Sequence, residues 1–452
     1  MEISNRQRNM MLAVMMVGGF FSALSQSMLT AALPVVMDEF IITATLGQWL
    51  TTSYIMVLGI VTSMTAYLIN RCHTQKLFIS AMLLFLAGSL ISLKAPSFGI
   101  LLFARVMQAA GAGILLPLIQ VIGFQTIPEE NRGRAMGLMG LVIAFAPAIG
   151  PTISGVIVDF SGWRSIFALL SFSSVIIIAA ALFFVFDVGE KIASKMDILS
   201  ALAYGLAFSG IMLGVTNREN YGWFDPYTLG PAFLGLLLLV FFVRRQLSQK
   251  DPLLELRIFS NYKFAAAAVL NMISYLIMMS GTILVPIYIQ TVRGLPALTS
   301  GLVLLPGSLL LALFSPVSGY LLDRYGPRMT TISGMILMAI SAVSFSFFTV
   351  STPIWIVTTL YAIRMVGVAA ILMPLTAYGI GVLEKKYVAH GTAVVTSLRQ
   401  MTGALGSAIL VAIMSTASAG QISADIAGIN ATFAAQALVI IAGMVLAFRW
   451  IK

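Results

Sequence analysis

Three arginines, Arg105, Arg364 and Arg399, stand within otherwise apolar stretches of the chain, and Arg105 has Gln108 three residues further on. Three-residue spacing places two side chains on one face of a helix. An arginine in a lipid-embedded helix costs about 2.5 to 3.5 kcal/mol, so each should face the protein interior or a water-filled cavity. There it could hold an anionic group or influence a proton site. The alternative is a structural role, in which the guanidinium bonds backbone carbonyls and, for Arg105, Gln108.

The composition excludes most other chemistry. Of the 452 residues 59% are hydrophobic and 9% are charged, against about 25% charged residues in soluble domains, so we predict a membrane protein. One cysteine, Cys72, cannot build a disulfide framework, and two histidines, His73 and His390, supply little metal chemistry. We expect no cofactor and no metal. A membrane-embedded enzyme would need clustered His, Asp, Glu or Cys, which the chain does not supply.

Apolar runs predict the elements that position these arginines. A helix needs about 20 apolar residues to cross the hydrocarbon core. Dividing the sequence at charges, polar runs and clusters of Pro, Gly and Asn predicts fourteen transmembrane helices. The expected ranges are 11–34, 47–69, 76–95, 97–122, 134–158, 163–185, 197–217, 227–243, 264–290, 300–322, 329–348, 354–383, 390–418 and 430–451.

Basic residues predict the orientation, because cytoplasmic loops retain Lys and Arg. With the N-terminus inside, most of the 26 Lys and Arg residues are cytoplasmic, and only Lys94, Arg164, Arg218 and Arg293 fall outside. We therefore expect a multi-pass protein of the cell membrane with both termini in the cytoplasm. The net charge of +10 is then explained by topology, and we expect no nucleic-acid partner. The first apolar run is too long for a signal-peptide core and is interpreted as a retained helix.

The chain also repeats itself. Residues 66–71 are echoed by 319–324, and Arg105 with the segment after it is echoed by Arg364. Both echoes have the same predicted orientation, which indicates a duplicated six-helix unit. The seventh and eighth helices are left over and carry no deep charge, so we expect them at the periphery. The predicted domains are a six-helix bundle (1–190), two inserted helices with a cytoplasmic linker (191–260) and a second six-helix bundle (261–452).

The stretch 319–328 resembles the G-x-L-x-D-R-x-G-R/K loop of the major facilitator superfamily. Glycine permits close approach of helices, while Asp323 beside a helix end, with Arg324 following, makes a breakable latch on the cytoplasmic face. The N-terminal copy is degraded, and Asn70 stands at the position of the aspartate. Asp323 is therefore expected to hold the latch, and Asn70 cannot supply its charge.

Two further patterns resemble drug:proton antiporters of this superfamily. Arg105, Gln108 and Gly111 match the pattern of the fourth helix, and Gly150 with Pro151 matches the antiporter motif of the fifth. Proline removes a backbone donor and glycine permits close packing, so the fifth helix can bend against a neighbour. Segments around Trp49, Trp163 and Arg399 also resemble the fourteen-span branch, so the resemblance covers nearly the whole chain. It implies an all-α polytopic fold of two six-helix pseudo-repeats with two inserted helices.

The departure from the family concerns proton coupling. Many relatives read L-D-x-T in the first helix, where this chain has Leu24, Ser25, Gln26 and Ser27. With a rise of about 1.5 Å per residue, Ser25 and Arg105 both lie roughly 9 to 12 Å below the outer surface. We therefore expect the guanidinium group of Arg105 to form hydrogen bonds with Gln26, Thr30, Gln108, backbone carbonyls or water. The cavity candidates are Ser25, Gln26, Thr30, Tyr54, Gln120 and Asn271.

The resemblance implies a transporter that rocks its two halves around a substrate site near the membrane midplane. The expected function is efflux of amphipathic drugs or related small organic compounds, driven by proton antiport. The alternative is export of a specific endogenous metabolite or lipid, with coupling that does not use a first-helix carboxylate. The expected partners are a small-molecule substrate, protons and the lipid bilayer, and we expect a monomer. A receptor or scaffold would be expected to carry an extramembrane domain, and no predicted loop is long enough to form one.

Overall fold

The computed structural model describes residues 4–42, 44–188, 197–417 and 426–451, apart from some side chains within these ranges. Every element described there is a helix, which confirms the all-α class. The long helices are α1 (Asn5–Phe40), α2 (Ala44–Arg71), α3 (Thr74–Leu93), α4 (Phe98–Thr126), α5 (Arg132–Ser161), α6 (Arg164–Phe184), α7 (Ile198–Tyr221), α8 (Pro226–Ser248), α9 (Tyr262–Ile287), α10 (Ala297–Phe345), α11 (Ile354–Gly381), α12 (Val388–Ala417) and α13 (Ile426–Trp450). The connections hold η1 (Glu129–Asn131), η2 (Leu256–Ser260), η3 (Tyr288–Val292) and η4 (Lys385–Tyr387).

One helix differs from the prediction. α10 carries two predicted spans in 49 residues, and only Gly326 departs from helical geometry, with φ 80° and ψ 173°. Glycine adopts this positive φ without strain, and Pro327 can begin the helix that follows. The break expected between the two spans lies at Gly326, and it is shorter than the expected interval 323–328 because Asp323 and Arg324 lie on the helix before it. Eleven described helices are long and apolar enough to cross a membrane, and the count of fourteen spans stays a prediction.

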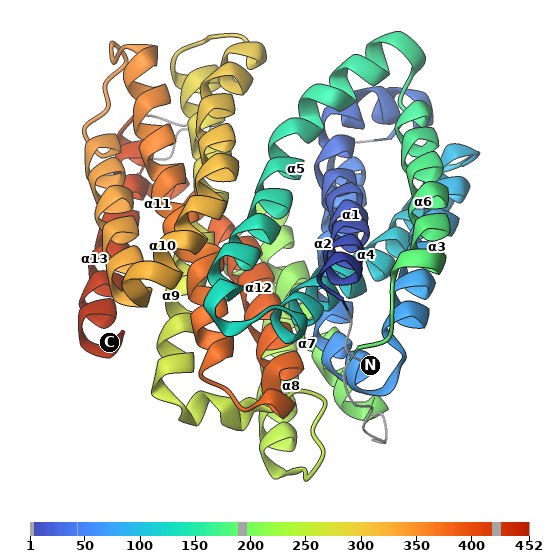
Figure 1. Cartoon of the computed structure of the whole chain (residues 1–452). Coiled ribbons are helices and arrows are strands. Elements are labelled where there is room, and N and C mark those ends of the chain that lie inside the picture. Colours follow the sequence, from blue (N-terminus) through green and yellow to red (C-terminus); the bar gives the residue numbers. More distant parts are fainter. Residues whose placement is uncertain (1–3, 43, 189–196, 418–425, 452) are drawn as a thin grey trace.

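The helices gather into two groups (Figure 1). α1 to α6 pack largely among themselves, as do α9 to α13. The groups meet along two seams, where α5 packs against α10 and α2 packs against α12.

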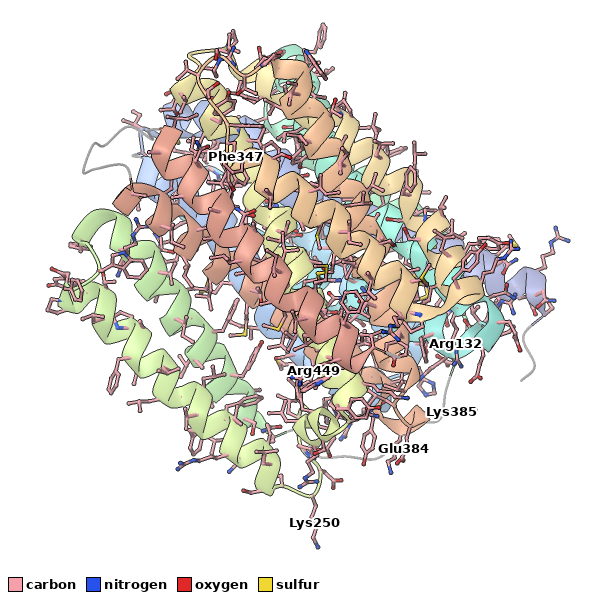
Figure 2. The ribbon with its side chains drawn as sticks, turned by 90° about the vertical axis from the view of Figure 1, so that its left-hand side faces the viewer. Arg132, Lys250, Phe347, Glu384, Lys385 and Arg449 are labelled. Carbon is pink, nitrogen blue, oxygen red and sulfur yellow. The ribbon has the colours of Figure 1, made fainter. Side chains whose placement is uncertain are left out.

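The helix pair α7 and α8 lies at the edge of the molecule (Figure 2). α7 contacts both helices of the seam between α2 and α12. A Cβ added to Gly59 of α2 would lie 2.9 Å from the Phe208 ring, and the Tyr204 hydroxyl lies 3.7 Å from the sulfur of Met401 on α12. The pair is peripheral, as expected from its lack of deep charges, and it also covers the seam between α2 and α12.

Basic residues mark one end of the bundle. Arg132, Lys385 and Arg449 lie there, and Phe347 lies at the other end (Figure 2). We call the end with these three basic residues the basic end. The rule that cytoplasmic loops retain positive charge predicts that it faces the cytoplasm.

Among the described residues, the apolar core joins the two groups at the basic end. One cluster there combines residues of α1 and α4, such as Leu12 and Phe124, with residues of α9 and α11, such as Phe264 and Ile380. Towards the other end each group has a cluster of its own, around Leu101 in the first group and around Phe345 in the second. The described arrangement is therefore closed at the basic end.

A polar clasp fixes the first group at the end opposite the basic end. Trp163 Nε1 donates a hydrogen bond of 2.6 Å to Glu39, and Arg164 pairs with the same carboxylate at 2.6 Å. Arg164 also donates to the Ala95 carbonyl at 3.1 Å. The Trp163 hydrogen bond, and to a smaller degree Arg164, lowers the pKa of Glu39 despite partial burial. The segment around Trp163, which includes Arg164, thus ties α1, α6 and the α3–α4 connection together.

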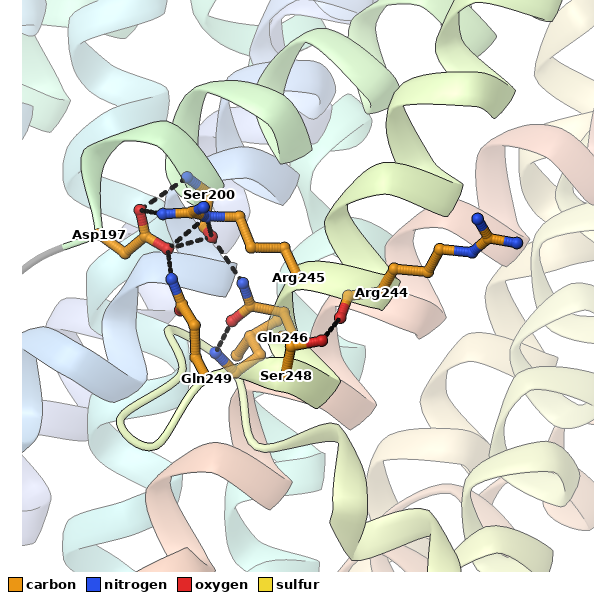
Figure 3. Close-up of polar contacts among 8 residues, drawn as sticks. Asp197, Ser200, Arg244, Arg245, Gln246, Ser248 and Gln249 are labelled. Atoms are coloured by element: carbon orange, nitrogen blue, oxygen red, sulfur yellow. Dashed lines mark hydrogen bonds and ion pairs between the residues drawn. The ribbon is translucent and has the colours of Figure 1, made fainter.

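A second polar network holds the inserted pair at the base of α7 (Figure 3). Asp197 caps α7 by accepting from the backbone and hydroxyl of Ser200. Its carboxylate also accepts from Arg245 Nε at 2.9 Å and from Gln249 at 2.6 Å. Arg244 points away from the network. Partial burial alone would raise the pKa of Asp197, but the bonds from Arg245, Ser200 and Gln249 lower it overall.

The network continues into the connection between α8 and α9. Gln246 donates to the Ser200 hydroxyl at 2.7 Å and accepts from the backbone of Leu254 at 3.0 Å. Next along the chain, the Glu255 backbone donates to His390 Nδ1 of α12 at 3.3 Å. The inserted pair is thereby tied to the second helix group through the chain that joins them.

We predict that Asp197→Asn destabilises the protein by on the order of 2 kcal/mol, because hydrogen bonds to a charged group are lost. The lowered pKa means that the stabilisation is complete above the ordinary carboxyl value of about 4 and is lost as the pH falls below it. Thermal unfolding in detergent should show a lower midpoint for the variant at pH 7 and a narrowing gap below about pH 4. An unchanged midpoint at pH 7 would contradict this account.

Candidate functional site

Arg105 lies on α4 with none of its side chain exposed. Its Nη1 donates to Ser25 Oγ at 3.0 Å, to the Ser25 carbonyl at 3.4 Å and to Gln108 Oε1 at 2.8 Å. The common layer predicted for Ser25 and Arg105 is therefore a direct contact in the structure. Gln108 and a backbone carbonyl were expected partners, whereas Gln26 is half-buried and the Thr30 side chain lies outside the described residues.

Four helices surround this guanidinium. The Tyr54 ring of α2 lies 4.2 Å from the guanidinium carbon, and the Tyr54 hydroxyl donates to the Ser22 carbonyl of α1 at 3.1 Å. Gln108 donates to Ser89 of α3 at 2.7 Å. Nε and Nη2 of Arg105 have no hydrogen-bond partner among the described residues. The site holds a buried cation whose hydrogen-bonding groups are only partly used by the described residues.

Glycines set the distance between α3 and α4 beside this site. A Cβ on Gly111 would lie 2.5 Å from the Ala81 carbonyl, and a Cβ on Gly88 would lie 2.6 Å from the Ala104 carbonyl. Any larger residue would push the two helices apart. Gly111 of the fourth-helix motif thus has a packing role that helps to hold Gln108 near Ser89.

The counterpart, Arg364 on α11, has a different environment. Its side chain is fully buried, and its guanidinium carbon lies 5.1 Å from each of the Phe345 and Phe433 rings. None of its three side-chain nitrogens has a hydrogen-bond partner among the described residues. Burial of an unpaired cation is costly, so this position is the less satisfied of the two pseudo-equivalent arginines.

The other candidates of the second group do not join one site. Arg399 on α12 is 2% exposed and lies 5.5 Å from the Tyr275 ring. Asn271 of α9 donates to the Leu372 carbonyl at 2.6 Å and to Thr376 at 2.7 Å, which ties α9 to α11. These contacts describe a structural asparagine, and Arg399 packs on an aromatic ring near the seam with α2.

Two candidates of the first group lie where α1, α4 and α5 approach. A Cβ on Gly150 would lie 1.9 Å from Ser27 Oγ, so the antiporter-motif glycine lets α5 touch α1. The Pro151 side chain lies outside the described residues. Gln120 is 1% exposed, and neither of its amide atoms has a described partner.

The expected latch has a specific partner. Asp323 Oδ1 accepts a 2.9 Å hydrogen bond from the Gly133 backbone N–H, at the second residue of α5. The carboxylate therefore meets the positive end of a helix in the opposite group. Arg324 turns to the Tyr320 hydroxyl at 3.1 Å. The expectation that Asp323 contacts a helix end agrees with this geometry.

Sequence reasoning missed the glycines that receive the latch. A Cβ on Gly133 would lie 2.3 Å from Asp323 Oδ1, and a Cβ on Gly137 would lie 2.3 Å from the Ser315 carbonyl. The G-x-x-x-G spacing of Gly133 and Gly137 is the signal that could have identified a close helix crossing here.

Comparison with known proteins agrees with this arrangement. A family model described as Major Facilitator Superfamily matches residues 15–407. The chain is 36% identical over 446 residues to the MFS-type transporter YcnB of Bacillus subtilis, covering 98% of this chain and 94% of that one. It is 35% identical over 409 residues to the lincomycin resistance protein LmrB of the same species, covering 90% and 85%. The human organic anion transporter MFSD10 shares the fold, with a TM-score of 0.71, 13% identity and coverage of 97% and 99%.

We predict that Asp323→Asn lowers transport more than Asn70→Ala does. The substitution removes on the order of 1 kcal/mol of charge-assisted bonding at the start of α5, which favours opening of the basic end. Gly133→Ala should act in the same direction, because its methyl group displaces the carboxylate. The transport rate of each of the three variants can be measured in proteoliposomes. Equal and near-normal rates for Asp323→Asn and Asn70→Ala would remove Asp323 from the mechanism.

Proposed function

Since the chain belongs to the major facilitator superfamily and is a secondary transporter rather than an enzyme, we propose that it exports amphipathic drugs or related small organic compounds by proton antiport. The observation that carries this proposal is the buried Arg105 site, which holds an incompletely bonded cation between helices of one half. The names of relatives such as the lincomycin resistance protein support the drug class. The Arg105 site would bind the substrate or influence its release.

In this proposal, fourteen spans form two bundles, residues 1–190 and 261–452, with both termini in the cytoplasm and residues 191–260 between them. Closure at the basic end then corresponds to a state open to the outside. Rocking of the bundles would separate α5 from α10 and α2 from α12 at that end. The latch of Asp323 on α5 would have to break at each turnover.

The coupling group differs from that of relatives with a first-helix acid. Ser25 occupies the place beside Arg105 where those relatives carry aspartate, and serine cannot neutralise the guanidinium. Among the described residues Arg105 takes part in no ion pair. The cavity should therefore be more positive than in such relatives, and it should disfavour dicationic compounds.

The first test is efflux from proteoliposomes with and without an imposed pH gradient. We expect lincomycin to move against its concentration gradient when the proton gradient is present and to stop when a protonophore collapses it. A transport rate that does not depend on the pH gradient would contradict proton antiport. A deletion strain with normal drug susceptibility and an altered metabolite profile would favour the alternative, export of an endogenous metabolite or lipid.

A further prediction concerns the selectivity of transport for the charge of the substrate. The wild type should prefer neutral, zwitterionic or anionic compounds over dications of similar size, because desolvated like charges repel. Ser25→Asp should raise transport of dications about tenfold relative to anions, with Ser25→Asn as the isosteric control. Competition assays with matched cationic and anionic substrates measure the ratio. If the wild type prefers dications and Ser25→Asp leaves this preference unchanged, the hypothesis that Arg105 disfavours dications is contradicted.

A further inference from the structure

A pocket separates the inserted helix α8 from α12 of the second group, and the connection 254–260 lines it at the basic end. Its cavity volume is about 630 Å³, within the usual range of sites for organic ligands. α8 packs on α7 and reaches η2, but among the described residues it has no extensive packing against α12. The pocket therefore occupies the place where a helix–helix interface would otherwise form.

The two long walls of the pocket are apolar. On α8, Leu239, Val243 and Leu247 recur every four residues and so share one face of the helix. On α12, Val394 and Leu398 show the same spacing. Water in the pocket would leave both faces hydrated, which costs free energy in proportion to their apolar area. The walls therefore favour an apolar occupant.

The pocket opens towards the surface of the bundle that lies in the membrane. Val243 and Leu247 line the pocket and are also 36% and 47% exposed. They belong to α8, which is long and apolar enough to cross a membrane. Lipid acyl chains are the apolar molecules next to such a surface. An acyl chain can thus enter the pocket without crossing any helix.

An arginine stands at the end of the pocket next to the headgroups. Arg257 lines the pocket, and its side chain is 48% exposed. Its Nη2 donates to the carbonyls of Leu247 and Gln249, at 3.0 and 2.6 Å, which places the guanidinium at the end of α8. Its Nη1 lies 3.6 Å from the Glu255 carboxylate, a loose ion pair. Arg257 can therefore meet a further anion from the exposed side.

Other cations add to the positive charge around Arg257. Residues 244–257 hold four basic and two acidic side chains. Arg245 is paired with Asp197, whereas Arg244 and Lys250 take part in no ion pair among the described residues. Lys250 lies at the tip of the chain beyond α8 (Figure 2). A basic pocket of this kind, between helices at the cytoplasmic side, suits an anionic lipid headgroup.

We propose that the α8–α12 pocket binds an anionic phospholipid from the leaflet at the basic end. One acyl chain fills the space between α8 and α12, and the phosphate group meets Arg257, with Arg244 and Lys250 adding to the attraction. The lipid thereby joins the inserted pair to the second helix group where the two do not pack directly. This inference does not depend on which compounds the protein transports.

The first arm of the test fills the space for the acyl chain. Leu239→Trp and Val243→Trp place a ring in the pocket, and Leu237→Trp adds the same ring at a position of α8 that is 51% exposed and outside the pocket. The full chain, purified in detergent, is titrated with dioleoyl phosphatidylglycerol, and native mass spectrometry measures the bound lipid. We expect the Kd to rise about tenfold in the two pocket variants and to stay at the wild-type value in Leu237→Trp.

The second arm tests the headgroup. Arg257→Gln should weaken phosphatidylglycerol binding about fivefold, whereas Arg6→Gln, which removes the same charge from the exposed start of α1, should not. Dioleoyl phosphatidylcholine, with the same chains and no net charge, should bind the wild type about tenfold more weakly. Phosphatidylglycerol should raise the thermal unfolding midpoint of the wild type and of Leu237→Trp, but not that of Leu239→Trp.

Three results would overturn the proposal. Equal affinity for the two phospholipids would exclude recognition of an anionic headgroup. Unchanged phosphatidylglycerol binding in Leu239→Trp and Val243→Trp would place the lipid elsewhere. A lipid-free dimer that these variants convert to a monomer would assign the pocket to a second copy of the chain. The thermal midpoint of each variant without added lipid separates lost binding from misfolding, because Arg257 also bonds the end of α8.

Discussion

A positive charge buried in an apolar helix bundle has to be met by polar groups within hydrogen-bond distance, and this requirement organises the first half of the molecule. Arg105 draws the Ser25 hydroxyl and carbonyl from α1, Gln108 from its own helix and the Tyr54 ring from α2. Gln108 then reaches Ser89 on α3. Four helices are thus held around one guanidinium. In the second group Arg364 has aromatic rings instead, so the two arginines differ in their bonding.

The second constraint is close approach of backbones, which permits the contacts that a transport cycle has to make and break. Gly133 and Gly137 bring α5 against α10, and Gly150 brings α5 against α1. One helix therefore touches the second group on one face and its own group on the other. α5 carries both the contact with Asp323 and the close approach to α1, the helix of Ser25.

Much of this architecture could be predicted from one sequence, because lipid imposes strong rules on composition. Apolar runs located the helices, and the cost of a charge in lipid placed Arg105 inside the protein. The rise per residue put Ser25 in the same layer, where the structure shows a hydrogen bond. The shortness of the break in α10 was missed, because the motif around Gly326 and Pro327 was interpreted as a loop, whereas only Gly326 departs from helical geometry. The Gly133 donor was missed because a backbone N–H leaves no residue type to search for.

The use of a backbone donor at this latch has a consequence for how the contact can evolve. A salt bridge between side chains can be lost by substitution of either partner, and its strength falls with salt. Here the donor is a backbone N–H, which every residue except proline would supply at position 133, and a Cβ at that position would lie 2.3 Å from Asp323 Oδ1. A substitution can therefore weaken this contact from either side, by removing the carboxylate of Asp323 or by adding a side chain at Gly133 that displaces it.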